Sequence, residues 1–130
     1  MGWVTPQSSV GLVGAQEPET EKLPQYFSER GFGVHRFATL LDPPRFAGVK
    51  DALVLFADTF APEAIVAWVA QLAKAAPERL MIVLTATPAH FTGPTALSGK
   101  NTVLLVRPVL AWHLVDVIRN HIARHVAGRA

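Results

Sequence analysis

The sequence of 130 residues contains no cysteine. This excludes disulfide bonds, thiolate metal sites and cysteine nucleophiles. Charge is also scarce, because only 17% of the residues are charged and the net charge is +2. So small a surplus, spread along the chain without a basic stripe, argues against nucleic-acid binding. The most apolar stretch, residues 61–76, contains polar side chains and is shorter than the roughly 20 residues that a membrane span needs.

Half of the residues are hydrophobic, which is enough to form a core. At roughly 100–200 residues per domain, we expect a single domain over residues 1–130, with a flexible N-terminus over 1–9 and a tail over 127–130. The first residues lack the positive start and the apolar run of a signal peptide. These features predict a cytoplasmic protein with no membrane insertion.

Strand and helix patterns alternate along the chain. Apolar or alternating runs predict five strands, over 10–15, 32–39, 51–57, 80–85 and 102–106. Helical spacing predicts three longer helices, over 17–30, 63–76 and 112–126. The connections 40–48 and 90–100 are rich in proline or glycine and favour short helices or loops. The alternation predicts an α/β fold with one parallel sheet covered by helices on both faces, and any site is then expected at the carboxyl ends of the strands.

Three predicted strand ends carry a distinctive set of residues. They are Asp58 four residues before Pro62, Thr85 before Ala86, and Arg107 before Pro108. In this order, over residues 10–122, the chain resembles the receiver domains of two-component response regulators (the CheY-like superfamily). The resemblance implies a flavodoxin-like sheet of five parallel strands in the order 2-1-3-4-5.

The same resemblance exposes departures from the family pattern. Receivers place two acidic residues at the end of the first strand, where they hold Mg²⁺ together with the aspartate that takes a phosphoryl group. Here that end has Gly14 and Ala15, and only Glu17 or Glu19, further on, could bring a carboxylate. Arg107 stands where receivers have lysine, and Leu104 stands at the switch aromatic.

These departures identify an atypical receiver, or pseudo-receiver, with no enzymatic activity, no metal and no cofactor. Its degenerate phosphoacceptor site would consist of Asp58, Thr85, Arg107 and Pro108. We expect Asp58 to form an ion pair with Arg107. The simpler interpretation is that Asp58 caps the helix that follows it.

The predicted function is that of a non-catalytic signalling module that binds protein partners in a bacterial-type pathway. The expected partner surface comprises the segment 90–100, the last strand and the last helix, with Leu104, Trp112, Asp116 and Arg119 as its contact residues. A homodimer is a further expectation. Two alternatives stay open: a phosphorylatable receiver with Asp58 as the phosphoacceptor, and a small-ligand-binding domain that uses the strand-end crevice.

Two other signals have plain structural interpretations. His121 and His125 have a spacing that can bind zinc, but no third ligand is near them in the sequence, so a solvated helix face is the preferred interpretation. Trp68 either covers the rim of the core or belongs to a partner surface.

Overall fold

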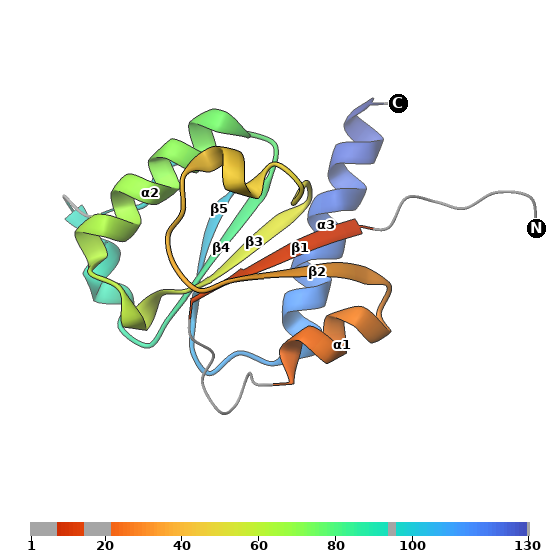
Figure 1. The fold of residues 1–130 in the computed structure, drawn as a ribbon, viewed down its shortest axis with the longest axis horizontal. Coiled ribbons are helices and arrows are strands. Elements are labelled where there is room, and N and C mark those ends of the chain that lie inside the picture. The colour runs from red at the N-terminus through yellow and green to blue at the C-terminus, as the bar shows by residue number, and fades with distance from the viewer. Residues whose placement is uncertain (1–7, 15–21, 94–95, 130) are drawn as a thin grey trace, which may run out of the picture.

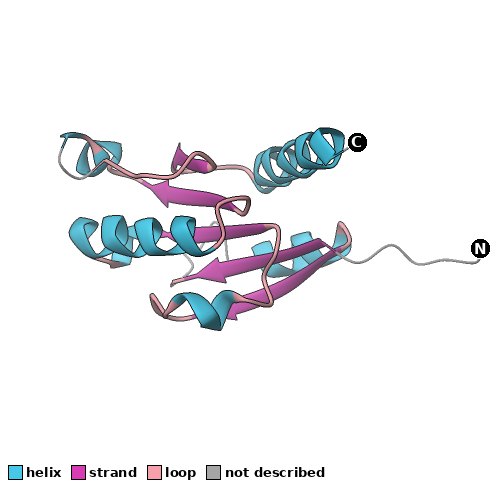
Figure 2. Cartoon of the chain, turned by 90° about the horizontal axis from the view of Figure 1, so that it is seen from above, coloured by secondary structure: helices cyan, strands magenta, loops and turns pink. Residues whose placement is uncertain are grey.

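The computed structural model describes residues 8–14, 22–93 and 96–129. Its five strands are β1 (Ser8–Val13), β2 (Phe32–Phe37), β3 (Ala52–Phe56), β4 (Leu80–Thr85) and β5 (Thr102–Val106). They form one sheet in the order β2-β1-β3-β4-β5, in which every neighbouring pair is parallel. The strands therefore point the same way, as their arrows in Figure 2 show. The predicted flavodoxin-like sheet is confirmed.

Three α-helices cover the two faces of this sheet (Figure 1). They are α1 (Leu23–Glu29), α2 (Pro62–Ala75) and α3 (Ala111–Arg129). The helices α1 and α3 pack on one face, where Leu23, Phe27 and Leu114 are buried against β1, β3 and β4. Helix α2 packs on the other face, where Ile65 and Leu72 are buried. The core therefore consists of two apolar layers separated by the sheet.

Two connections contain a short 3₁₀ turn instead of an α-helix. These turns are η2 (Pro43–Phe46), which follows β2, and η4 (Pro88–Phe91), which follows β4. A proline lies in the first positions of each turn, where its fixed φ angle is suitable and its missing N–H is not needed. Both turns still contribute to the core, because Phe46 and Phe91 are buried. The short or irregular structure predicted for residues 40–48 and 90–100 agrees with this.

Several predicted boundaries were wrong. Ser8 and Ser9 belong to β1, whereas residues 1–9 were expected to be flexible. Helix α3 reaches Arg129, so three residues of the expected tail 127–130 are helical. Helix α1 begins only at Leu23, because Pro24 fits its first turn and does not interrupt its middle. The earlier part of the helix predicted over 17–30 falls partly in residues 15–21, outside the described part of the chain.

The structure also settles two of the structural interpretations. Trp68 is 5% exposed and its indole N–H donates to the carbonyl of Leu41 at 2.9 Å, so it is a core residue. His121 is 4% exposed and its Nε2 lies 2.8 Å from the Glu78 carbonyl, so the solvated position expected for it was wrong. The side chain of His125 lies outside the described part. Among the described helices, none is long and apolar enough to cross a membrane.

Candidate functional site

Asp58 lies at the carboxyl edge of the sheet, in the 3₁₀ turn η3 (Ala57–Thr59) that follows β3. Thr85 is the last residue of β4, which pairs with β3 in parallel register. Arg107 follows β5, the next strand along the sheet. Parallel pairing therefore brings three residues that are far apart in the sequence to one edge, as the strand-end argument predicted.

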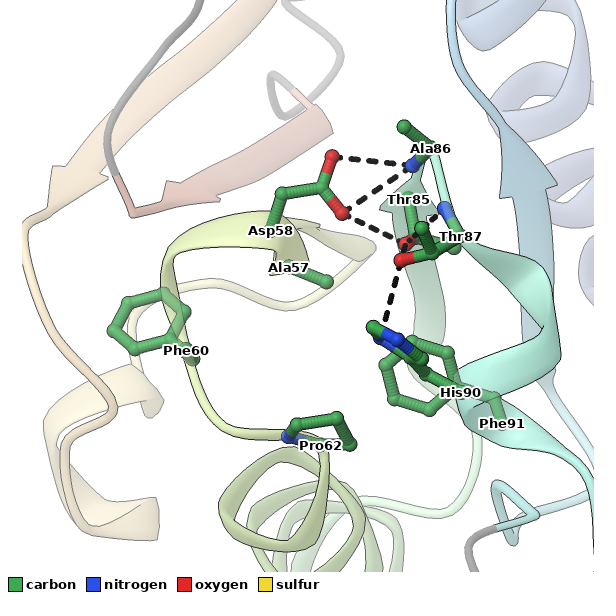
Figure 3. Close-up of a pocket in the computed structure, with 9 residues that line it drawn as sticks. All are labelled: Ala57, Asp58, Phe60, Pro62, Thr85, Ala86, Thr87, His90 and Phe91. Carbon is green, nitrogen blue, oxygen red and sulfur yellow. Dashed lines mark hydrogen bonds between the residues drawn. The ribbon is translucent and has the colours of Figure 1, made fainter.

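The two oxygens of the Asp58 carboxylate accept hydrogen bonds from Thr85, Ala86 and Arg107, and Figure 3 shows those from Thr85 and Ala86. The Thr85 hydroxyl donates to Oδ1 at 2.7 Å, and the backbone N–H of Ala86 lies 3.2 Å and 3.1 Å from the two oxygens. Arg107 Nη1 donates to Oδ2 at 2.7 Å. The ion pair predicted between Asp58 and Arg107 is therefore present.

The surroundings of Asp58 favour its charged form. The Asp58 side chain is 23% exposed and that of Arg107 is 11% exposed. Burial acts to raise the pKa of the Asp58 carboxyl, but the hydrogen bonds from Thr85 and Ala86 and the bond and charge of Arg107 outweigh it and hold this pKa below its usual value of 3.8. Asp58 is therefore ionised near neutral pH. The N-cap residue of α2 is Ala61 and no side chain caps this helix, so the interpretation that Asp58 caps it was wrong.

Gly14, directly after β1, occupies the position where an acidic residue was missing. Its φ angle is +101°, and a Cβ atom there would lie 3.0 Å from the Phe56 carbonyl oxygen and 3.0 Å from the Phe60 ring. A side chain is thus opposed both by backbone conformation and by close contacts. The local backbone conformation therefore disfavours any side chain at this position, a carboxylate included.

No protein-family model matches the sequence, and no curated protein sequence matches it either. Several solved structures share its fold. A response regulator receiver protein from Sinorhizobium medicae has a TM-score of 0.72 at 9% identity, over 90% of this chain and 95% of that one. The signal receiver domain of an HD domain-containing protein from Pseudomonas fluorescens has a TM-score of 0.67 at 17% identity, over 94% and 99%. The chain has the receiver fold.

A third structure with this fold is a response regulator protein from Burkholderia pseudomallei, solved with a phosphorylated aspartic acid, a calcium ion and citrate. It has a TM-score of 0.62 at 16% identity, over 95% of this chain and 73% of that one. At such identities the likeness concerns the receiver fold alone. The peptide bond between Arg107 and Pro108 is cis.

The described residues do not fit the Mg²⁺ ion that receivers use. The oxygens of Asp58 are already engaged by protein donors, and Gly14 has no side chain. Within the described ranges, no group of three or more His, Cys, Asp or Glu side chains could hold a metal ion. Mg²⁺ requires near-octahedral oxygen coordination, which one engaged carboxylate does not provide. Ala15, Glu17 and Glu19 lie outside the described part.

A pocket of about 400 Å³ adjoins Asp58. Asp58, Thr85, Thr87 and His90 line one part of it, and Phe60, Pro62 and Phe91 line an apolar part (Figure 3). Sequence reasoning did not place Thr87 and His90 at this pocket, although residue 90 begins the segment that was expected to bind a partner. The only available signal was that both follow the strand-end Thr85 within five residues, whereas their contacts depend on the conformation of η4.

The four expected contact residues of the partner surface do not all share one face. Trp112 is 55% exposed, and Asp116 and Arg119 are exposed on the same side of α3, since they follow it by four and seven residues. Leu104 is half-buried against the α2 side of the sheet, opposite to α3. Two exposed apolar residues that had not been singled out, Val106 at 53% and Leu110 at 62%, precede Trp112.

Proposed function

We propose that this chain is a receiver-like signalling module that does not depend on Mg²⁺-assisted phosphorylation of Asp58 and that acts by binding protein partners. The observation that carries this proposal is that both oxygens of the Asp58 carboxylate already accept hydrogen bonds from protein side chains, an arrangement that we call the closed site. Oδ1 is bonded to the Thr85 hydroxyl and Oδ2 to Arg107. Whichever oxygen received a phosphoryl group, its present donor would have to withdraw.

Electrostatics argues in the same direction. Phosphoryl transfer depends mainly on positioning and on neutralising the charge of the phosphoryl oxygens. In this site the Arg107 charge is already paired with Asp58 at 2.7 Å, and the positive φ angle and close contacts at Gly14 oppose a carboxylate side chain there that would bring a metal ion. The site is therefore better suited to holding one conformation than to exchanging between two.

The main alternative is a receiver in which Asp58 does accept a phosphoryl group. One observation favours it: Asp58, Thr85 and Arg107 occupy the strand ends that the family resemblance implies. A phosphorylated aspartic acid is also present in the similar Burkholderia pseudomallei protein. The pocket of about 400 Å³ beside Asp58 leaves a small-ligand-binding domain as the other alternative.

Incubation with a small phosphoryl donor and Mg²⁺, followed by intact-mass measurement, tests the proposal. We expect no added phosphate on the wild-type chain, under conditions in which a conventional receiver is modified. A phosphate that appears on the wild type and is lost in Asp58→Ala would contradict the proposal and establish the phosphoacceptor. An increase in thermal stability with nucleotides or small anions, but not with donor and Mg²⁺, would favour the ligand-binding alternative.

We assign the partner surface to the exposed face of α3 and the segment before it. Trp112, Asp116 and Arg119 lie on this face, and Leu110, in the segment that precedes α3, adds exposed apolar area. Tryptophan is common among residues that dominate binding energies, and exposed apolar side chains that lie close together often mark interfaces. The expected partner is a protein of a signalling pathway or a second copy of this chain, in a cytoplasmic setting.

A further inference from the structure

The hydroxyl of Thr85 has a second set of contacts on the side away from Asp58. Its oxygen accepts a hydrogen bond from the backbone N–H of Thr87 at 3.0 Å and lies 3.3 Å from the Thr87 hydroxyl oxygen. The Thr87 hydroxyl oxygen in turn lies 3.1 Å from Nδ1 of His90. Four side chains thus form a continuous row from Asp58 to His90 (Figure 3).

Counting protons gives this row a direction. A threonine hydroxyl has one proton to donate, and Thr85 donates it to Asp58. A bond between the two hydroxyls must therefore use the proton of Thr87. The contact between Thr87 and His90 must then use a proton on Nδ1 of the imidazole ring.

We infer that Thr87 and His90 are positioning residues: a hydrogen-bond relay from His90 Nδ1–H through the Thr87 hydroxyl holds the Thr85 hydroxyl on Asp58. The relay begins at His90 in the exposed turn η4 and ends at a threonine that is 1% exposed. It deepens the proposed function and rests on it, because it explains how Thr85 stays in place at the closed site.

Nuclear magnetic resonance of the unmodified protein can test the direction of the relay. The ¹⁵N shifts of the His90 ring distinguish the two neutral tautomers, and we expect the form with the proton on Nδ1. In Thr87→Val this preference should weaken, whereas Thr87→Ser, which keeps the hydroxyl, should retain it. A wild-type ring with its proton on Nε2 would overturn the inference, since Thr87 would then donate to His90.

The position of Thr85 provides the second measurement. Exchange of its hydroxyl proton and its side-chain rotamer report whether it stays on Asp58. We expect about threefold faster exchange, the order of one weak hydrogen bond, in Thr87→Val and in His90→Leu. His90→Asn should restore slow exchange, because its amide N–H can take the place of Nδ1–H.

Unchanged exchange and an unchanged Thr85 rotamer in Thr87→Val and His90→Leu would overturn the relay. Both residues are exposed, so these variants are expected to fold, and the wild-type tautomer alone still decides the direction if one does not. The outcome is separable from the proposed function. Phosphorylation of wild-type Asp58 would refute that function and leave the tautomer measurement intact, while a failed relay would leave the Asp58–Arg107 pair in place.

Discussion

At the scale of single residues, Asp58 connects the site to the stability of the fold. Hydrogen bonds and the Arg107 charge hold its pKa below 3.8, despite the opposing effect of burial. A carboxylate with a lowered pKa stabilises the folded state above its unfolded pKa, and this contribution disappears as the pH falls through the folded pKa. The contribution of Asp58 should therefore be complete near neutral pH and lost only in acid.

Thermal unfolding of the wild type and Asp58→Asn over a range of pH tests this. The melting temperature of the wild type should exceed that of the variant by a constant amount down to about pH 5. The difference should shrink once the pH falls below 3.8, because the Asp58 carboxyl of the unfolded chain then takes up a proton while that of the folded chain is still ionised. A difference that remains constant through this acid range would show that Asp58 contributes no charge-dependent stability.

The residue scale also shows what could be predicted from the sequence. The pairing of Asp58 with Arg107 was predictable, because parallel strands bring consecutive strand ends to one edge. His121 was misassigned although a signal existed: it lies three residues after Ile118 and seven after Leu114, which are both buried on the same helix face. Thr87 and His90 had no such signal, since their contacts arise within the irregular turn η4.

At the scale of elements, Arg79 connects one layer of the fold to the start of β4. Its side chain is buried, and Nη1 donates to the carbonyls of Phe46 and Val49 at 3.1 Å and 3.0 Å. These carbonyls belong to η2 and the segment after it. In an α-helix such carbonyls would accept hydrogen bonds from backbone N–H groups of the same helix. Burial lowers the pKa of Arg79, because it disfavours the charged guanidinium. The two hydrogen bonds to the carbonyls must therefore offset the cost of removing this charge from water.

Arg79→Met should lower the free energy of unfolding by about 1–3 kcal/mol, because the Val49 carbonyl loses a buried donor. Denaturant unfolding measures the loss. Amide exchange of residues 46–50 should also accelerate more than that of β3. The matched control is Arg45→Met, since Arg45 is an exposed residue of η2. A variant as stable as the control would show that removing the buried charge compensates for the lost bonds.

The elements themselves followed from local rules to different degrees. The strands β4 and β5 have the predicted bounds, because their continuous apolar runs end at polar residues or proline. Helix α1 begins at Leu23 and not at residue 17, since the spacing pattern alone did not locate the start of the helix, which Pro24 marks. The connections with 3₁₀ turns were recognisable from their prolines and glycines, although their contribution of Phe46 and Phe91 to the core was not.

At the scale of the whole molecule, the Asp58 site and the proposed partner surface lie on different but adjoining parts of the surface. The carboxyl edge holds the closed Asp58 site, whereas the α3 face begins just beyond Arg107 and presents exposed apolar side chains at Leu110 and Trp112. Because Arg107 precedes this segment directly, the site and the proposed partner surface share one stretch of chain. A site held in one state would keep that surface constantly available.

Binding measurements with variants of the α3 face test this arrangement. Trp112→Ala should weaken recovery of the partner about tenfold, the effect of roughly 1.4 kcal/mol at a binding hot spot. Arg119→Glu should weaken it as well. Trp112 is 55% exposed, so the melting temperature of Trp112→Ala should hardly change. Arg119→Glu should lower it slightly, because Arg119 Nη2 donates to the Arg30 carbonyl at 3.2 Å. Lys74→Ala, at an exposed position on α2, is the matched control and should bind normally.

If the partner is a second copy, sedimentation should show Trp112→Ala shifting the dimer toward monomer. Partner recovery and self-association that are both unchanged in Trp112→Ala and Arg119→Glu would place the interface elsewhere.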